Sequence, residues 1–435
     1  MSTKFSKVLF FLLVTILLVS VASCSGNAEP EEAKVLRFWH WEGEDTAQSQ
    51  SWDRAMEIFQ ERHPDVTIEF ERKTFEGMQQ NMQMILNSDD VPDVTALNKG
   101  NATAGLFSKQ GLLTDLTEAS QQYGWDDILS PSIQTTCRYT EDGLMSNDGT
   151  LYGITTYGEF IMVYYNKNMF AEYGLSVPTT YEEFKQVAQT FLDNGVQPMI
   201  IGGADNWTWT HNWQELVLYN QTREGINNFQ FLQGTTDFHS DAWTWGTEEL
   251  LNQVKAGYYG TGFNGTSGDD ASLAFTNGTV PMFLAGSWYF GSYLTNITDF
   301  EWDIFLMPDK QYTTGSGGNL FVVPAKAKNK EMAYEFLDIL MSEEVQTVMA
   351  VKGGIPVNAD TTQIEDLHVK ALNEAFSSIV SNDGLAFYPD WPVPGFMDVI
   401  GAGLQEVAAE TITPDEFLTN TQNAYDEGKA DTLGQ

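Results

Sequence analysis

The chain has 435 residues, of which 60 are acidic and 22 are basic, and its formal net charge is −38 at pH 7. Its length is typical of two globular domains, and 42% of its residues are hydrophobic, which is too many for a disordered chain. The negative charge argues against nucleic acid and against an anionic membrane surface as partners, because both are bound through basic faces. The two cysteines are too few for a disulfide framework or a cysteine-based zinc site.

The N-terminal segment predicts export and a lipid anchor. A basic start precedes an uncharged, mostly apolar stretch over residues 8–21, and Cys24 follows after two small residues. This pattern is typical of a secretory signal, and the stretch is shorter than the about 20 residues that span a bilayer. Residues 21–24 resemble a bacterial lipobox, in which Cys24 becomes the lipidated N-terminus. The alternative is ordinary cleavage near Ser23, with no role for Cys24. We therefore expect a signal peptide over 1–23, a lipidated cysteine and tether over 24–34, and an exported protein held at the cell membrane.

Strands and helices alternate at the start of the body. A β-branched and aromatic run over residues 35–41 predicts a strand. Trp52, Ala55, Met56 and Phe59 then recur at the spacing of an amphipathic helix. The next expected elements are a strand at 66–70, a helix at 75–86 and a strand at 92–97. This alternation predicts an α/β lobe with a largely parallel sheet.

The rest of the chain predicts a second α/β region. Thr180 and Glu183 are spaced as a capping box at the start of a helix, and Thr413, Pro414 and Glu416 open the last helix. The other expected elements are paired segments at 151–156 and 160–166, strands at 198–201, 280–284 and 319–323, and a helix at 330–341. The body is therefore predicted to be two α/β lobes.

The common catalytic motifs are missing from the sequence. It has no nucleophile elbow, no phosphate-binding loop, and no pair of histidines at metal-ligand spacing on one helix. The glycines of 260–265 match a dinucleotide-binding pattern, yet no clear strand precedes them and no helix opens on the last one. We therefore expect no cofactor and no metal site.

Acidic residues leave one enzymatic alternative open. Glu42, with Glu44 or Asp45, would be the pair to suspect in a glycoside hydrolase. Adjacent acids on one loop do not naturally straddle a scissile bond, however. We therefore favour the interpretation that one of them accepts a hydrogen bond from a ligand hydroxyl while the others are solvated.

Tryptophans give the positive signal. Several are expected in loops or at strand ends, beside amides, acids and glycines: Trp39, Trp41, Trp207, Trp209, Trp213, Trp288 and Trp391. Flat rings beside polar groups suit sugars, because the C–H faces of a sugar are apolar and its hydroxyls need hydrogen-bond partners. The alternative for each ring taken singly is that it packs as part of the core.

The order and spacing of several segments resemble a known family. The segments are 35–41, 91–94, 151–154, 163–184, 278–288 and 317–333. Together they resemble the family 1 extracellular solute-binding proteins of ABC importers, the maltose and multiple-sugar-binding type. Pro281 stands where the family usually has alanine, which is a small departure.

The resemblance implies an α/β, two-lobed periplasmic-binding-protein fold of type II, with a ligand cleft between lobes that are joined by a multi-strand hinge. The N-terminal lobe would comprise 35–156 and 310–384, and the C-terminal lobe 157–309 and 385–435. The chain would cross between lobes near 155–163, 304–311 and 381–389. Such a protein performs no chemistry; it closes around its solute, as a monomer, and docks on ABC permease subunits.

The resemblance also implies which residues contact the ligand. The predicted set is Trp41, Glu42, Asn98, Lys99, Trp209, Trp213, Trp288, Gly318, Asn319 and Trp391. Aromatic stacking from both lobes favours a carbohydrate, most naturally a neutral oligosaccharide. A polyamine in the same fold is the alternative ligand, because Glu42, Glu44, Asp45 and Asp390 could surround ammonium groups. An exported glycoside hydrolase remains the alternative from another class.

Overall fold

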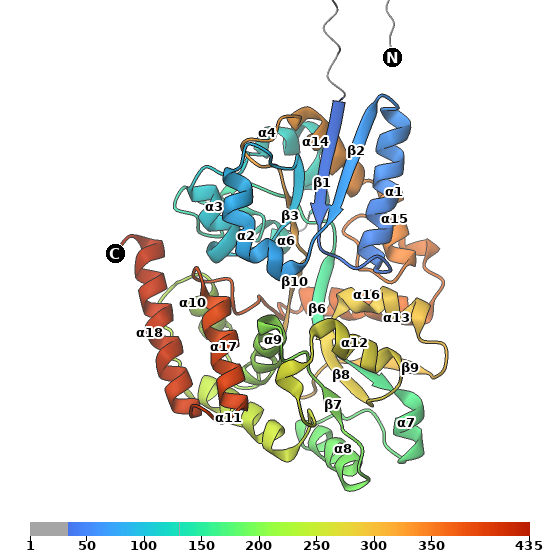
Figure 1. Cartoon of the computed structure of the whole chain (residues 1–435), viewed down its shortest axis with the longest axis vertical. Helices are drawn as coiled ribbons and strands as arrows, with labels where there is room; N and C mark the ends of the chain where they lie inside the picture. The colour runs from blue at the N-terminus through green and yellow to red at the C-terminus, as the bar shows by residue number, and fades with distance from the viewer. Residues whose placement is uncertain (1–33, 130) are drawn as a thin grey trace, which may run out of the picture.

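Two β-sheets organise the chain, one in each of two lobes (Figure 1). The structure is a computed structural model that describes residues 34–129 and 131–435. The predicted signal peptide, Cys24 and the tether up to residue 33 therefore lie outside the described residues. In the part of the chain that is described, no helix is both long enough and apolar enough to cross a membrane.

The sheet of the first lobe has the order β11-β3-β1-β2. β1 is parallel to β2 and β3, whereas β11 is antiparallel to β3. These strands are β1 (Lys34–His40), β2 (Val66–Arg72), β3 (Val94–Leu97) and β11 (Leu320–Val322). Phe38 on β1 lies at the centre of the core, where its ring contacts those of Trp52, Phe321 and Phe336. The predicted strand–helix alternation is thus confirmed in this lobe.

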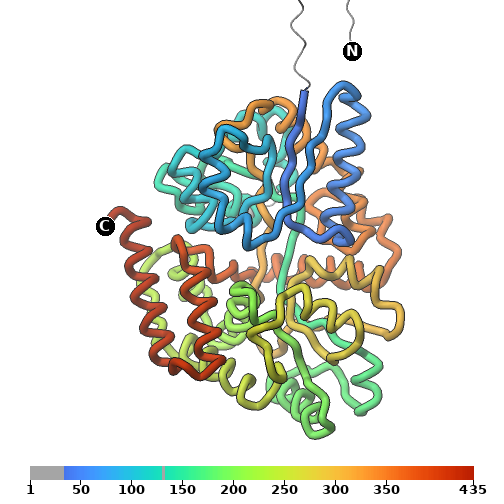
Figure 2. Tube along the Cα trace, viewed as in Figure 1, coloured from blue at the N-terminus to red at the C-terminus, as the bar shows by residue number. Residues whose placement is uncertain are grey.

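The helices of the first lobe come from two separate parts of the chain. They are α1 (Ala47–Arg62), α2 (Phe75–Asn87), η1 (Asn101–Gly105), α3 (Leu106–Lys109), α4 (Thr117–Tyr123), α5 (Trp125–Ile128), α6 (Pro131–Gln134), α14 (Lys330–Met341) and α15 (Glu343–Val351). A small hairpin joins β4 (Arg138–Tyr139) to β5 (Thr150–Leu151). Figure 2 shows the late orange segment beside the blue N-terminal segment in the upper lobe.

The sheet of the second lobe has the order β12-β10-β6-β8-β7, and β9 also pairs with β6. Its strands are β6 (Gly158–Asn166), β7 (Met199–Ile200), β8 (Met282–Gly286), β9 (Trp302–Phe305), β10 (Thr313–Gly317) and β12 (Leu385–Ala386). β6 is buried along its whole length, as expected for a central strand with both faces covered.

The second lobe also contains most of the helices. They are α7 (Lys167–Glu172), α8 (Tyr181–Asp193), α9 (Asn206–Val217), α10 (Arg223–Gln230), α11 (Asp241–Ala256), η2 (Phe263–Gly265), α12 (Gly268–Thr276), η3 (Ser287–Tyr289), α13 (Phe290–Asn296), α16 (Leu367–Ser381), α17 (Phe396–Ala408) and α18 (Pro414–Leu433), with η4 (Thr361–Gln363) before α16. The capping box predicted at Thr413 and Glu416 is formed at the start of α18.

Three segments lie side by side where the lobes meet. Ile154 forms an antiparallel bridge with Phe321, and Tyr157 forms one with Pro356. The N–H of Gly158 donates to the carbonyl of Ile355 at 2.7 Å. The chain therefore passes between the lobes near residues 154–158, near 317–321 and after 356.

The last two of these crossings differ from the positions that the sequence analysis expected, near 304–311 and 381–389. Residues 313–317, expected in the first lobe, form β10 and pair with β6 in the second sheet. Helix α16, also expected in the first lobe, packs on the second: Phe376 stacks on Phe160 of β6 with ring centroids 6.0 Å apart. The glycine-rich run at 315–318 reads as a loop, but burial against β6 makes most of it a strand.

Candidate ligand-binding site

A cavity of about 720 Å³ lies between the lobes. Its size is in the range of small-molecule sites. Residues of both lobes and of the segments between them line it, including Trp41, Glu42, Phe75 and Asn98 from the first lobe, Trp207, His211, Trp288 and Tyr289 from the second, and Glu159, Asn319, Tyr388, Asp390 and Trp391 near the base. Six of the ten predicted ligand residues thus meet in one cleft: Trp41, Glu42, Asn98, Trp288, Asn319 and Trp391.

Aromatic rings reach the cavity from both lobes. Trp41 follows β1 and lies edge-on to Phe75, with ring centroids 5.3 Å apart. Trp288 follows β8 and lies edge-on to Trp207 at 5.8 Å. Trp391 contacts Tyr388 at the base of the cavity. Rings held in this way offer rigid apolar faces to a ligand without losing further side-chain freedom on binding.

Buried carboxylates lie between the aromatic walls. Glu42 Oε1 accepts hydrogen bonds from Asn319 Nδ2 at 3.2 Å and from the Tyr157 hydroxyl at 3.4 Å. Asp390 Oδ2 accepts one from Asn98 Nδ2 at 3.0 Å, and Glu159 Oε1 accepts one from a serine hydroxyl at 3.2 Å. These partners fix the carboxylates and leave other oxygens as acceptors for ligand hydroxyls.

Burial disfavours the charged forms of these carboxylates. It raises the pKa of Glu42 to about 8, and the charge of Glu159 adds to this effect. Burial likewise raises the pKa of Glu159 to about 7 and that of Asp390 to about 6. Perturbed carboxyl groups of this kind gather at functional sites more often than elsewhere. Within residues 34–129 and 131–435, no acidic, histidine or cysteine side chains are grouped so as to hold a metal ion.

Lys99 and Gly318 are predicted ligand residues that do not line the cavity. Lys99 lies behind it, fully buried, and its Nζ donates to the carbonyl of Gly317 at 2.6 Å and to Thr136 Oγ1 at 3.0 Å. Gly318 donates its N–H to the carbonyl of Tyr157 at 2.6 Å. Both residues thus tie the crossing segments together beneath the site, which is a positioning role.

Trp209 and Trp213 are also placed away from the cavity. They lie on α9, where both side chains are 0% exposed. Trp209 Nε1 donates to the carbonyl of Gly203 at 2.9 Å, and Trp213 Nε1 donates to Thr247 Oγ1 at 2.8 Å. The segment was expected to be a loop, in which each ring could turn to the ligand; in a helix the two rings share the core-facing side.

Trp207 and His211 occupy the other side of the same helix. They are also four residues apart, so they point in one direction, and both line the cavity. Burial lowers the pKa of His211 to about 3, so its ring is neutral at physiological pH. His211 Nδ1 is buried and has no hydrogen-bond partner among the described residues. Reading 206–217 as a helix would have found both residues.

A family model for the bacterial extracellular solute-binding proteins matches residues 43–347 of the chain. The chain belongs to this family. The prediction made from the sequence segments is therefore confirmed, and the two-lobed α/β architecture agrees with it.

Two named proteins and a solved structure are similar to this solute-binding protein over most of its length. The diacetylchitobiose-binding protein DasA of Streptomyces coelicolor is 22% identical, over 86% of this chain and 87% of that protein. The arabinooligosaccharide-binding protein of Bacillus subtilis is also 22% identical, over 84% of both chains. A solved chitin oligosaccharide binding protein superposes with a TM-score of 0.76 at 19% identity, covering 91% of this chain and 99% of the other.

The loop that carries Trp391 is docked on the first lobe. The N–H of Ala102 donates to the carbonyl of Trp391 at 2.9 Å. Gly100 has a φ of +86° and lies against the Cα and Cβ of Trp391, so a Cβ at this position would overlap Trp391. This solute-binding protein therefore needs glycine at position 100 both for the backbone conformation and for the seat of Trp391.

Gly100→Ala is expected to lower the free energy of unfolding by about 2–3 kcal/mol, because it adds backbone strain and displaces Trp391. Urea unfolding followed by tryptophan fluorescence measures this loss. Gly111→Ala is the matched control, because Gly111 also has a positive φ but has no atom within 4 Å of a new Cβ. Equal losses in the two variants would show that the seat of Trp391 contributes nothing.

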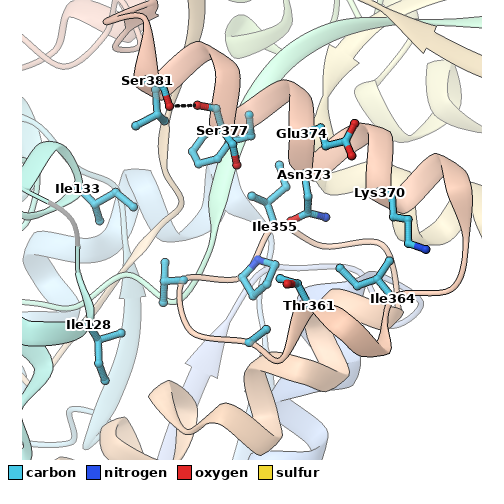
Figure 3. A pocket seen from close by; sticks show the side chains of 15 residues that line it. Ile128, Ile133, Ile355, Thr361, Ile364, Lys370, Asn373, Glu374, Ser377 and Ser381 are labelled. Carbon is cyan, nitrogen blue, oxygen red and sulfur yellow. Dashed lines mark hydrogen bonds between the residues drawn. The ribbon is translucent and has the colours of Figure 1, made fainter.

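A second cavity, of about 790 Å³, lies on the other face of the crossing segments (Figure 3). Ile128 and Ile133 line it from the first lobe, and Asn373, Ser377 and Ser381 line it from α16. Its wall combines aliphatic and polar side chains with one aromatic ring, that of Phe376, and one carboxylate, that of Glu374, whereas several of each line the cleft. The cleft is therefore the better candidate for the solute site of this protein.

Proposed function

We propose that this solute-binding protein captures a carbohydrate in the cleft by closure of its lobes and delivers it to the permease of an ABC importer. The observation that carries the proposal is the set of aromatic rings from both lobes around buried carboxylates and amides. Such a site matches the apolar faces and the hydroxyl rim of a sugar. Contacts with both lobes favour the closed form, because the ligand binds that form more tightly.

Two of the relatives are named for binding diacetylchitobiose and arabinooligosaccharides. This supports a carbohydrate as the ligand of the present protein. We propose a neutral oligosaccharide as the ligand. We further propose that the protein is exported, that lipid (palmitate) on Cys24 holds it at the membrane surface, and that it acts as a monomer. The chain would bind its sugar without cleaving it.

Trp288→Ala is expected to weaken carbohydrate binding about 30-fold or more, because truncating a buried aromatic contact at a binding site costs roughly 2 kcal/mol or more. Isothermal titration calorimetry measures the change. Trp245→Ala is the control, because Trp245 packs against Tyr181 and Tyr219 and does not line the cavity. Equal effects of the two substitutions on affinity would contradict the stacking role of Trp288.

The proposed function is tested by screening the soluble body, residues 34–435, against oligosaccharides and polyamines. A ligand at about 100 times its dissociation constant stabilises the folded state by roughly 2.7 kcal/mol, which thermal unfolding and tryptophan fluorescence detect. We expect one oligosaccharide series to stabilise the protein. We also expect the sugar to be recovered intact after overnight incubation. Stabilisation by polyamines alone, if it is lost at high salt, would indicate that the ligand is a cation and not a sugar. Cleavage of the sugar would indicate that the protein is a hydrolase.

A further inference from the structure

Two half-buried side chains join the lobes directly across the cleft. Trp207 Nε1, in the first turn of α9, donates to Glu76 Oε1, in the first turn of α2, at 3.1 Å. Both residues also line the cavity. The bond therefore forms part of the wall of the site and at the same time spans the gap that must open when a ligand enters.

Trp207 is held firmly on the side of the second lobe. Its ring packs against Gly268, where a Cβ would lie 2.5 Å from the ring, and it meets Trp288 edge-on. Asp205, at the start of the same helix, accepts a hydrogen bond from the N–H of Gly268 at 2.7 Å. Because the indole is confined in this way, its N–H points to a fixed place, and the Glu76 carboxylate meets it there.

A second bond joins the lobes elsewhere around the cavity. Asn296 Nδ2, at the end of α13, donates to Asp45 Oδ2 in the loop before α1. Both residues line the cavity. Figure 1 shows α1 and α13 to the right of α2 and α9, so the two interlobe bonds close different sides of the cleft. The second pair is exposed and contributes little energy.

We propose that the Glu76–Trp207 hydrogen bond is a clasp that closes one side of the cleft and limits the carbohydrate to a length that the closed cavity can contain. This inference rests on the proposed function. A longer chain would have to leave the cleft between the lobes, and on this side it would displace the clasp. Breaking the clasp leaves the indole N–H and the half-buried Glu76 carboxylate without their hydrogen bond. The free-energy cost of this loss weakens the binding of long ligands.

The test uses linear chito-, malto- and xylo-oligosaccharides of increasing length as probes and measures affinity by calorimetry. In the native protein, we expect affinity to rise with length and then to fall about tenfold or more once the cavity is full. In Glu76→Ala and Trp207→Phe, this fall should shrink to about threefold or less, because long chains no longer break a bond. Glu76→Gln keeps an acceptor oxygen and should retain the native length profile.

A separate readout tests the clasp without any ligand. Small-angle X-ray scattering of the unliganded protein should show a larger radius of gyration in Glu76→Ala and Trp207→Phe than in the native protein and in Glu76→Gln. Glu343→Ala is the control for loss of a helix-first-turn charge, because Glu343 is exposed in the first turn of α15.

The outcomes separate the inference from the proposed function. Binding of long and short probes with equal affinity, or an unchanged length profile in Glu76→Ala, would overturn the length limit. Equal radii of gyration in all variants would overturn the clasp. If no probe series binds at all, the carbohydrate proposal fails for those series, and scattering still decides whether the clasp exists.

Discussion

Glu42→Gln is expected to stabilise the unliganded protein at alkaline pH and to leave its stability at pH 4 nearly unchanged. The ordinary pKa of a glutamate is 4.5, and burial raises that of Glu42 to about 8. Below pH 4.5 the carboxyl is neutral in both the folded and the unfolded state, so its favourable contribution to stability is fully present. As the pH rises to about 8, the unfolded state ionises first, and this contribution is lost.

At full ionisation, such a difference in pKa lowers the free energy of unfolding by roughly 4–5 kcal/mol. Access of water to the cleft makes this loss smaller. We therefore expect Glu42→Gln to raise the free energy of unfolding by about 2–4 kcal/mol at pH 9. The amide oxygen can still accept hydrogen bonds from Asn319 and Tyr157. Urea unfolding at pH 4 and pH 9 measures the difference.

Glu44→Gln is the control, because Glu44 follows closely on the same loop and is exposed. It should leave the pH dependence of stability as in the native protein. At pH 9, where native Glu42 is largely ionised, the same Glu42→Gln variant should bind carbohydrate more weakly, because an amide oxygen accepts hydrogen bonds less strongly than a carboxylate. A Glu42→Gln protein with the native pH profile would show that Glu42 ionises freely in the folded state.

Glu215→Ala is expected to lower the free energy of unfolding by about 3–5 kcal/mol, because it leaves a buried ammonium without a counter-charge. Glu215 Oε2 lies 2.5 Å from Lys310 Nζ, and both side chains are 1% exposed. The other oxygen of Glu215 accepts the N–H of Thr314 on β10 at 2.8 Å. The pair thus fastens α9, which carries Trp207 and His211, to the strand that enters the crossing. Urea unfolding measures the loss.

The double variant Glu215→Leu/Lys310→Met separates the charge effect from packing. Because it removes both charges together, we expect a smaller loss in the free energy of unfolding than in Glu215→Ala. The remaining loss should come mainly from the N–H of Thr314, which no longer has a hydrogen-bond acceptor. If the double variant were as unstable as Glu215→Ala, a buried unpaired charge could not be the cause. The single variant Lys310→Met leaves Glu215 without its partner. Measuring it as well allows a double-mutant cycle, which gives the interaction energy of the pair.

The tryptophans show which features of the site could be predicted from the sequence and which could not. Tryptophans beside amides and acids predicted a sugar site, and Trp41, Trp288 and Trp391 do lie in the cleft. Within 206–217, however, composition suggested a loop, whereas helical spacing divides the rings between two faces. Trp209 therefore belongs to the core and Trp207 to the cleft. Periodicity, rather than composition, decides which ring faces a ligand.

The lobe boundaries failed for a different reason. Residues 313–317 are rich in glycine and small polar residues, which predicts a loop. They form a strand because β6 lies alongside and supplies hydrogen-bond partners for their backbone. Similarly, nothing in the apolar stripe of α16 says which sheet it covers; the contact of Phe376 with Phe160 assigns it to the second lobe.

The sequence by itself determined the alternation of strands and helices, the capping of the last helix and the family, because these depend on residues close together in the chain. Tertiary structure alone decided which carboxylates share the cavity, where the lobes exchange segments, and that Glu76 meets Trp207. Those features join residues far apart in sequence: Glu42 and Asn319 meet because β1 ends and the oppositely directed β11 begins at the same edge of one sheet. The pKa values of the buried carboxyls follow from that assembly, since burial is a property of the folded chain.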